Sequence, residues 1–203
     1  MLEPANSTMT SPSSSSSISR SLTAHFGHTE LDAGSEAPRL RIVLSEGPLE
    51  LRWTHCSLTA DFIADLFAGL AARAKIDEDG ARHTIGYLAN ELLENAVKFR
   101  APGDVVVEAT LDGAEFTLAI SNYATPEMAK GLEGLIQDIT SKDPSDLLIE
   151  RMEANAENPE STGSGLGLLT LVNDYGVRLG WTIEPQAAGA SVHIRTIANV
   201  TLS

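Results

Sequence analysis

The stretch from Tyr87 to Arg100 constrains the fold more than any other part of the chain. At 3.6 residues per turn it predicts an amphipathic helix with two distinct faces. One face is a stripe that suits a protein core: Ile85, Leu88, Leu92, Ala96 and Phe99. Another face is polar: Tyr87, Glu91, Glu94, Asn95 and Lys98. Such a helix has to pack on a second layer with its apolar side.

The polar face of this helix has two interpretations. Glu91 and Asn95 are four residues apart, so their side chains lie one turn apart on the same side. A carboxylate, a carboxamide and the Lys98 ammonium in one row are suited to a metal, a phosphate and a proton transfer. The alternative is a solvated helix face, which is the commoner role of polar helix residues.

Composition narrows the classes of partner. The 203 residues include 14 Lys and Arg against 28 Asp and Glu, a formal net charge of −14. Nucleic acid and anionic membrane surfaces need basic patches, so this balance disfavours both as partners. A polyphosphate ligand would have to be held by local donors and a bound cation, against the field of the whole protein.

The cysteine count and the hydropathy predict a cytoplasmic protein. Cys56 is the only cysteine, so no intrachain disulfide is possible and a reducing compartment is expected. No apolar run approaches the length that spans a bilayer. The N-terminal residues lack the basic start and apolar core of a signal peptide.

The first 37 residues differ in composition from the rest. Ser, Thr, Pro, Gly and Ala dominate them, with five consecutive serines from Ser13 to Ser17. Ordering such a segment costs more conformational entropy than its few apolar side chains return. We therefore predict a disordered Ser-rich tail over 1–37 and one folded domain over 38–203.

Hydrophobic patterning in residues 38–203 predicts alternating pairs of strands and helices. The expected strands are 40–44, 49–53, 105–111, 114–121, 177–184 and 190–197. The expected helices are 58–74, the polar-faced helix, 127–140, 145–155 and a short helix after a glycine-rich run. Gly47-Pro48 and Asp112-Gly113 each predict a hairpin. This order predicts an α/β (α+β) two-layer sandwich, with a mixed, mostly antiparallel sheet covered by helices on one face.

Residues 123–164 are too long for a simple connection in a compact domain. Pro and Gly interrupt the segment repeatedly, and the second of its two predicted helices is acidic. Loops longer than about 12–15 residues in such domains are usually functional. We predict a lid, or a surface that binds a partner, over 123–164.

A glycine-rich run precedes the last predicted helix. Gly163, Gly165 and Gly167 permit close backbone approach, and a helix N-terminus attracts anions. The run is not a Rossmann fingerprint, because no parallel βαβ unit surrounds it, and no Gly-Lys-Ser/Thr follows to make a P-loop. By itself the run is as consistent with a generic glycine-rich loop as with a phosphate cradle.

The two segments together are more specific than either. The helical run Glu91-Leu-Leu-Glu-Asn95-Ala-Val-Lys98, a hairpin, a long lid and then Gly-Ser-Gly-Leu-Gly-Leu resemble the GHKL (histidine kinase-like, Bergerat-fold) ATPase superfamily. The resemblance covers about residues 40–197. It implies that the chain binds ATP with Mg²⁺.

The resemblance also implies a role for each matching residue. Asn95 looks like the asparagine whose side-chain oxygen ligates Mg²⁺, and Glu91 occupies the position of the catalytic general base. Lys98 sits where kinase members place a basic residue against the phosphates, while Glu94 is left as ordinary surface. The triphosphate would be capped by the glycine run and one backbone amide: Gly163, Gly165, Leu166 and Gly167.

One position departs from the superfamily pattern. After the second strand of the central hairpin, relatives have an Asp-x-Gly-x-Gly box whose Asp accepts a hydrogen bond from the adenine amino group. Here Asn122 replaces the Asp and the glycines are missing. The Oδ1 atom of Asn122 can still accept from an amino group, but without the assistance of a charge.

The chain resembles the small, stand-alone members of the superfamily. These are the anti-sigma-factor-like serine/threonine kinases and related ATP-binding regulators of bacterial partner-switching systems. The resemblance implies a Mg-ATP-dependent kinase that phosphorylates a STAS-like (anti-sigma-antagonist-like) partner, with a metal-dependent serine phosphatase in the same pathway. The apolar stripe of helix 58–74 would permit a homodimer.

Two alternatives to a kinase remain. The missing Asp and glycines favour a non-catalytic module that senses a nucleotide, or a degenerate one that binds none, and that sequesters a regulator. Plain ATP hydrolysis driving a conformational cycle is the weaker alternative, because no coupled domain is visible in the sequence.

Overall fold

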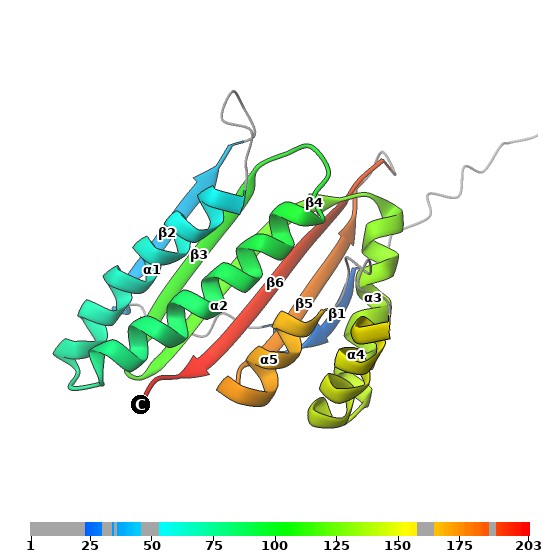
Figure 1. Ribbon diagram of the computed structural model, residues 1–203. Coiled ribbons are helices and arrows are strands. Elements are labelled where there is room, and N and C mark those ends of the chain that lie inside the picture. The colour runs from blue at the N-terminus through cyan, green and yellow to red at the C-terminus, as the bar shows by residue number, and fades with distance from the viewer. Residues whose placement is uncertain (1–22, 30–33, 35, 46–52, 158–164, 187–189) are drawn as a thin grey trace, which may run out of the picture.

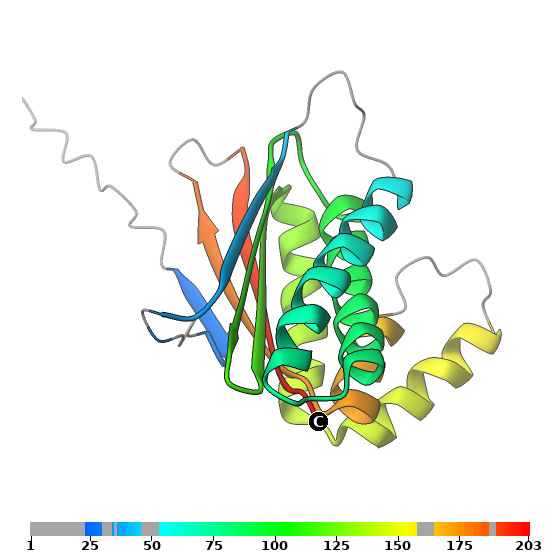
Figure 2. The ribbon, with the colours of Figure 1, turned by 90° about the vertical axis from the view of Figure 1, so that its left-hand side faces the viewer.

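The computed structural model describes residues 23–29, 34, 36–45, 53–157, 165–186 and 190–203. Six strands form one sheet in the order β1-β5-β6-β4-β3-β2, and the helices lie on one face of it (Figures 1 and 2). The strands are β1 (Ala24–Gly27), β2 (Arg39–Leu44), β3 (Val105–Asp112), β4 (Glu115–Ala124), β5 (Arg178–Pro185) and β6 (Val192–Thr201). The helices are α1 (Trp53–Arg73), α2 (Glu78–Lys98), α3 (Pro126–Ser141), α4 (Pro144–Glu157) and α5 (Leu166–Tyr175). This is the two-layer α+β sandwich that the sequence predicts.

The observed strands differ from two of the expectations and confirm a third. Each neighbouring pair among these strands is antiparallel, so the expectation of a mixed sheet is wrong. The predicted hairpin of β3 and β4 is confirmed, and Gly113 makes its turn at a φ of 59° that suits glycine. The predicted strand 49–53 is wrong at Trp53, which begins α1, and its other residues lie outside the described ones.

Strand β1 lies inside the segment that the sequence predicts to be a disordered tail. It pairs with β5 and places Phe26 opposite Trp181, against the core. The prediction is therefore wrong for 24–27, because four residues with one large apolar side chain carry no periodic signal and pair only across a long sequence separation. Residues 1–22 lie outside the described part of the chain.

Helix α2 joins the helical layer to the sheet. Asp77 caps its start by accepting a 2.8 Å hydrogen bond from the backbone N–H of Gly80. Its apolar stripe is buried as predicted, with Leu88 and Leu92 at most 2% exposed. Phe99 is the exception, at 40% exposed, because the helix ends at Lys98 and Phe99 only caps it.

Helix α1 carries apolar side chains on two faces. Ile63 and Phe67 are buried, and the Phe67 ring meets Phe116 of β4 edge-on at a centroid distance of 5.1 Å. A second row on this helix is exposed: Leu58, Phe62 and Leu66. The homodimer that this row would permit stays a prediction. No helix in the described ranges combines the length and hydropathy needed to cross a bilayer.

The two helices predicted between 123 and 164 are confirmed as α3 and α4. Thr125 caps α3, accepting from the N–H of Met128 at 3.3 Å, and Pro126 occupies its first position. The α4 helix is tied to α5 by a 2.6 Å hydrogen bond from the Ser145 hydroxyl to Asn173 Oδ1. The pair lies toward the β1 edge of the sheet, and α4 lies beside α5 (Figure 1).

The contact between β5 and the chain after β1 generates a stability prediction. A Cβ atom at Gly180 would lie 2.0 Å from the backbone oxygen of His28, whose N–H donates to Leu179 at 3.1 Å. Because backbone cannot rotate out of the way, Gly180→Ala should destabilise the protein by about 2 kcal/mol. Chemical denaturation measures this free energy of unfolding.

A glycine on the opposite layer provides the matched control. Gly69 lies in α1, where a Cβ atom would point into open space with nothing within 4 Å. Gly69→Ala should therefore stabilise the protein by about 0.5–1 kcal/mol, as expected for an exposed helix position. Equal effects of the two substitutions would contradict the packing of this segment on β5.

Candidate active site

A cavity of about 930 Å³ lies between the sheet and the helical layer. Its floor comes from the apolar side chains Ile120, Trp181 and Ile194 on neighbouring strands β4, β5 and β6. Helix α2 forms one wall, α3 with Arg151 of α4 forms another, and the start of α5 closes a third side. The size and the mixture of an apolar floor with polar walls suit a nucleotide-sized ligand.

The structure brings nearly all the predicted site residues into this one cavity. The residues that line it are Glu91, Asn95, Lys98, Asn122, Gly165, Leu166 and Gly167. Gly163 lies outside the described residues. Three segments that are far apart in the sequence therefore meet around a single space, and the roles assigned to their residues remain predictions.

Glu91 is a half-buried carboxylate in an unfavourable electrostatic setting. Burial raises the pKa of Glu91, the neighbouring charge of Glu94 raises that pKa further, and a hydrogen bond from Tyr87 opposes the rise. Glu94 is exposed, as the sequence suggests, and also lines the cavity. A carboxylate with a raised pKa in a cavity has the character of a general base.

The start of α5 approaches Glu91 closely. A Cβ atom at Gly167 would lie 1.7 Å from Glu91 Oε2, so a residue with any side chain would displace the carboxylate. Gly165 adopts a φ of 61°, and a Cβ there would lie 2.9 Å from Leu135 of α3. Both glycines are required for this packing, and Gly165 leaves the positive end of α5 without a capping side chain.

Asn95 follows Glu91 by one helical turn and offers a carboxamide to the cavity. Within the described ranges, no group of three or more His, Cys, Asp or Glu side chains gathers to hold a metal. A resident metal with protein ligands alone does not fit this donor set. Mg²⁺ fits, because it takes few protein ligands and prefers phosphate and water oxygens for the rest.

Asn122 of β4 lines the cavity from the side of the sheet. It is only 6% exposed, and its Nδ2 donates to the backbone oxygen of Tyr123 at 3.3 Å. Since a carbonyl oxygen can only accept, this contact sets the orientation of the carboxamide, with Nδ2 toward Tyr123. The carboxamide is therefore a neutral acceptor, where the resemblance seen in the sequence implies the carboxylate of an Asp.

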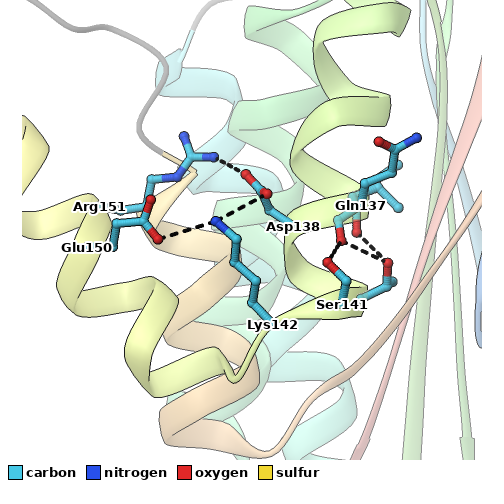
Figure 3. A network of polar contacts seen from close by, with 8 residues as sticks. Gln137, Asp138, Ser141, Lys142, Glu150 and Arg151 are labelled. Carbon is cyan, nitrogen blue, oxygen red and sulfur yellow. Dashed lines mark hydrogen bonds and ion pairs between the residues drawn. The ribbon is translucent and has the colours of Figure 1, made fainter.

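Sequence reasoning did not identify the charged residues of α3 and α4 that line the cavity. Asp138 of α3 and Arg151 of α4 both line it, and their side chains form a 2.8 Å ion pair (Figure 3). Lys142 continues the network to Asp138 at 3.4 Å and to Glu150 at 3.3 Å. Arg151 is the one basic residue of an acidic helix, but helical periodicity alone could not place it facing the cavity.

The raised pKa of Glu91 predicts a pH-dependent cost in stability. Since the folded state disfavours the ionised form, the contribution of Glu91 is fully favourable below its ordinary pKa of 4.5 and is lost as pH rises through the raised folded value. Glu91→Gln, which stays neutral, should therefore stabilise the protein by about 1 kcal/mol at neutral pH. The gain should disappear below pH 4.5.

Urea unfolding of both proteins at neutral and acidic pH measures this difference. Glu153→Gln is the matched control, because Glu153 is exposed on α4 and should give no comparable gain. A Glu91→Gln gain that is equally large at both pH values would contradict the raised pKa.

Comparisons with known proteins support the architecture. No protein-family model matches the chain, and no curated protein matches it either. Among solved structures, a chain in the crystal structure of the SiaB-SiaC complex from Pseudomonas aeruginosa superposes with a TM-score of 0.56. The two chains share 15% sequence identity, over 79% of this chain and 89% of that chain. At this identity the likeness shows a shared fold.

Proposed function

We propose that this protein binds Mg·ATP in the cavity and phosphorylates a serine or threonine of a STAS-like partner. The observation that carries the proposal is the meeting of Glu91, Asn95 and the Gly165–Gly167 turn around one cavity. The apolar floor suits a purine, and the start of α5 suits the phosphates.

Positioning and electrostatics dominate phosphoryl transfer, and the chain supplies both. Glu91 would accept the proton of the partner's serine or threonine hydroxyl. The hydroxyl oxygen would bond to the γ-phosphorus while the bond from that phosphorus to ADP breaks. Asn95 would hold Mg²⁺, which offsets phosphate charge when bound. Lys98 and Arg151 line the same cavity and would add positive charge near the phosphates.

The fold comparison supports a protein partner. The similar chain comes from the crystal structure of a complex, SiaB-SiaC. We therefore propose partner switching, in which phosphorylation changes which complex the partner joins and a metal-dependent serine phosphatase reverses it. Helices α3 and α4 both contribute residues to the cavity and would form the lid and part of the partner surface.

Asn122 favours a second candidate function. Its neutral oxygen replaces a carboxylate and weakens adenine recognition, because a hydrogen bond to a charged group is roughly twice as strong. In this candidate the protein senses a nucleotide, or binds none, and sequesters a regulator without transferring phosphate.

Two measurements separate these functions. In a thermal shift assay, Mg·ATP at one hundred times its dissociation constant should stabilise the protein by about 2.7 kcal/mol. Mg·GTP should give a smaller shift, because its O6 would face the acceptor Oδ1 of Asn122. Mass spectrometry should then detect phosphate on a STAS-like protein encoded beside this chain, with transfer lost in Glu91→Gln.

The outcomes are distinct. A shift without transfer would favour the nucleotide sensor, and the absence of any shift at millimolar ATP would favour a degenerate binding module. Transfer that is undiminished in Glu91→Gln would contradict the role of Glu91. Phosphate release in the absence of any partner would instead favour plain hydrolysis.

Arg151 generates a prediction about affinity. If its guanidinium binds a phosphate, Arg151→Ala should weaken Mg·ATP binding about tenfold, the size expected for one charge-assisted hydrogen bond. Lys130→Ala is the control, since Lys130 is exposed on α3 and does not line the cavity. Calorimetric titration measures both, and equal affinities would exclude Arg151 as a phosphate ligand.

A further inference from the structure

A row of polar and aromatic side chains on α2 faces α5. His83, Tyr87, Glu91 and Asn95 follow one another at four-residue intervals, so they lie along one side of the helix. The last two line the cavity, while the first two contact α5 outside it. The row therefore connects the cavity to the contact between the two helices.

Tyr87 is held in place by its ring. It stacks on Tyr175 at the end of α5, with ring centroids 5.1 Å apart and an interplanar angle of 18°. The Tyr175 hydroxyl in turn lies 3.0 Å from His83 Nε2, one turn earlier on α2. Stacking between rigid rings fixes the direction of the Tyr87 hydroxyl at little cost in side-chain entropy.

The Tyr87 hydroxyl interacts with Thr170 of α5 and with Glu91 of its own helix. Its bond with Thr170 lowers the pKa of Tyr87, as expected when the threonine hydroxyl donates to the phenol oxygen. Its bond with Glu91 lowers the pKa of that carboxyl, as expected when the phenol donates to the carboxylate. The Tyr87 hydroxyl therefore links Thr170 of α5 to Glu91 of α2.

The Glu91 carboxylate is confined from a second side by α5. The close approach of Gly167 leaves no room for a side chain between the helix and Glu91 Oε2. The phenol hydroxyl and the glycine together restrict where the carboxylate can lie. Both contacts come from α5 or from a residue that α5 holds, so the position of this helix sets the position of Glu91.

We propose that Tyr87, whose ring is held by stacking on Tyr175, is a positioning residue that orients the Glu91 carboxylate one helical turn away for proton transfer. This inference rests on the proposed function of Glu91 as a base. Tyr87 lies outside the glycine and asparagine motifs. Its role is to hold the Glu91 carboxylate in position and to keep that carboxylate ionised.

The charges around the pair are consistent with this role. Burial and then Glu91 itself raise the pKa of Tyr87, so the phenol keeps its proton and remains a donor at neutral pH. Tyr175 and Asp174 of α5 face Tyr87 and raise its pKa further, and Glu94 of α2 faces Glu91. Glu94 disfavours the ionised form of Glu91, and the Tyr87 phenol favours it.

The test uses Tyr87→Phe in the full chain, which keeps the stacked ring and removes the hydroxyl. Carboxyl carbon NMR titration without nucleotide should show the pKa of Glu91 rise by about 1, the size expected for losing one hydrogen bond to a charged group. Thr170→Val, which removes only the outer donor, should give a smaller rise. Tyr123→Phe is the matched control and should give none, because Tyr123 lies against His193 away from Glu91.

Tyr87→Phe should also move the pH profile of phosphate transfer to the partner, and Tyr123→Phe should not. In Tyr87→Phe the acidic limb of the pH–rate profile should shift to higher pH together with the pKa of Glu91. At pH values below the pKa of Glu91, the rate should therefore fall about tenfold. Affinity for Mg·ATP should stay within about twofold, since Tyr87 does not line the cavity. A merely structural role would not move the pH profile.

The outcomes distinguish the two inferences. An unchanged pKa of Glu91 in Tyr87→Phe would overturn the positioning role, whatever the activity. A raised pKa in a protein whose wild type transfers no phosphate would leave the positioning contact supported and remove the proposed function. A raised pKa with an unmoved acidic limb would overturn the role of the contact in proton transfer.

Discussion

The packing of α2 on the sheet is the contact on which the rest of the structure depends. Its apolar stripe is buried against the strands, and this burial directs the row of Glu91 and Asn95 toward the cavity. The same helix bears α1 on one side and α5 on another. One helix of 21 residues therefore organises both the core and the site. Burial of its apolar side stabilises the fold, and the same packing fixes the position of its polar side.

The site carries local costs that the fold as a whole offsets. A half-buried carboxylate beside a second carboxylate is unfavourable, and so is a glycine within the first turn of a helix. Both features occur where Glu91 and Gly167 meet. Each local cost agrees with the proposed role of Glu91 as a base that lies against the start of a helix. Stability given up at a few positions is common where chemistry needs a strained arrangement.

Much of the fold could be predicted because its elements carry strong local signals. The Asp112-Gly113 turn, the stripe of α2 and the two helices after Thr125 are each encoded within a short stretch. The errors fell where local signals are absent. The strand 24–27 has no periodicity of its own, and Trp53 follows apolar residues that suit a strand as well as a helix. The pairing of such short strands is decided by partners distant in sequence.

The sequence by itself determined which chemical groups the site has: Glu91 and Asn95 share one helix face, and the glycines precede an apolar helix. Spacing along a helix is a local property, so residue order is sufficient to read it. Only the tertiary structure decided that Arg151 and Asp138 reach the same cavity and that Tyr87 lies against Tyr175 of another helix. Those contacts join segments far apart in the chain. They arise from how the helices pack on the sheet, which no local pattern records.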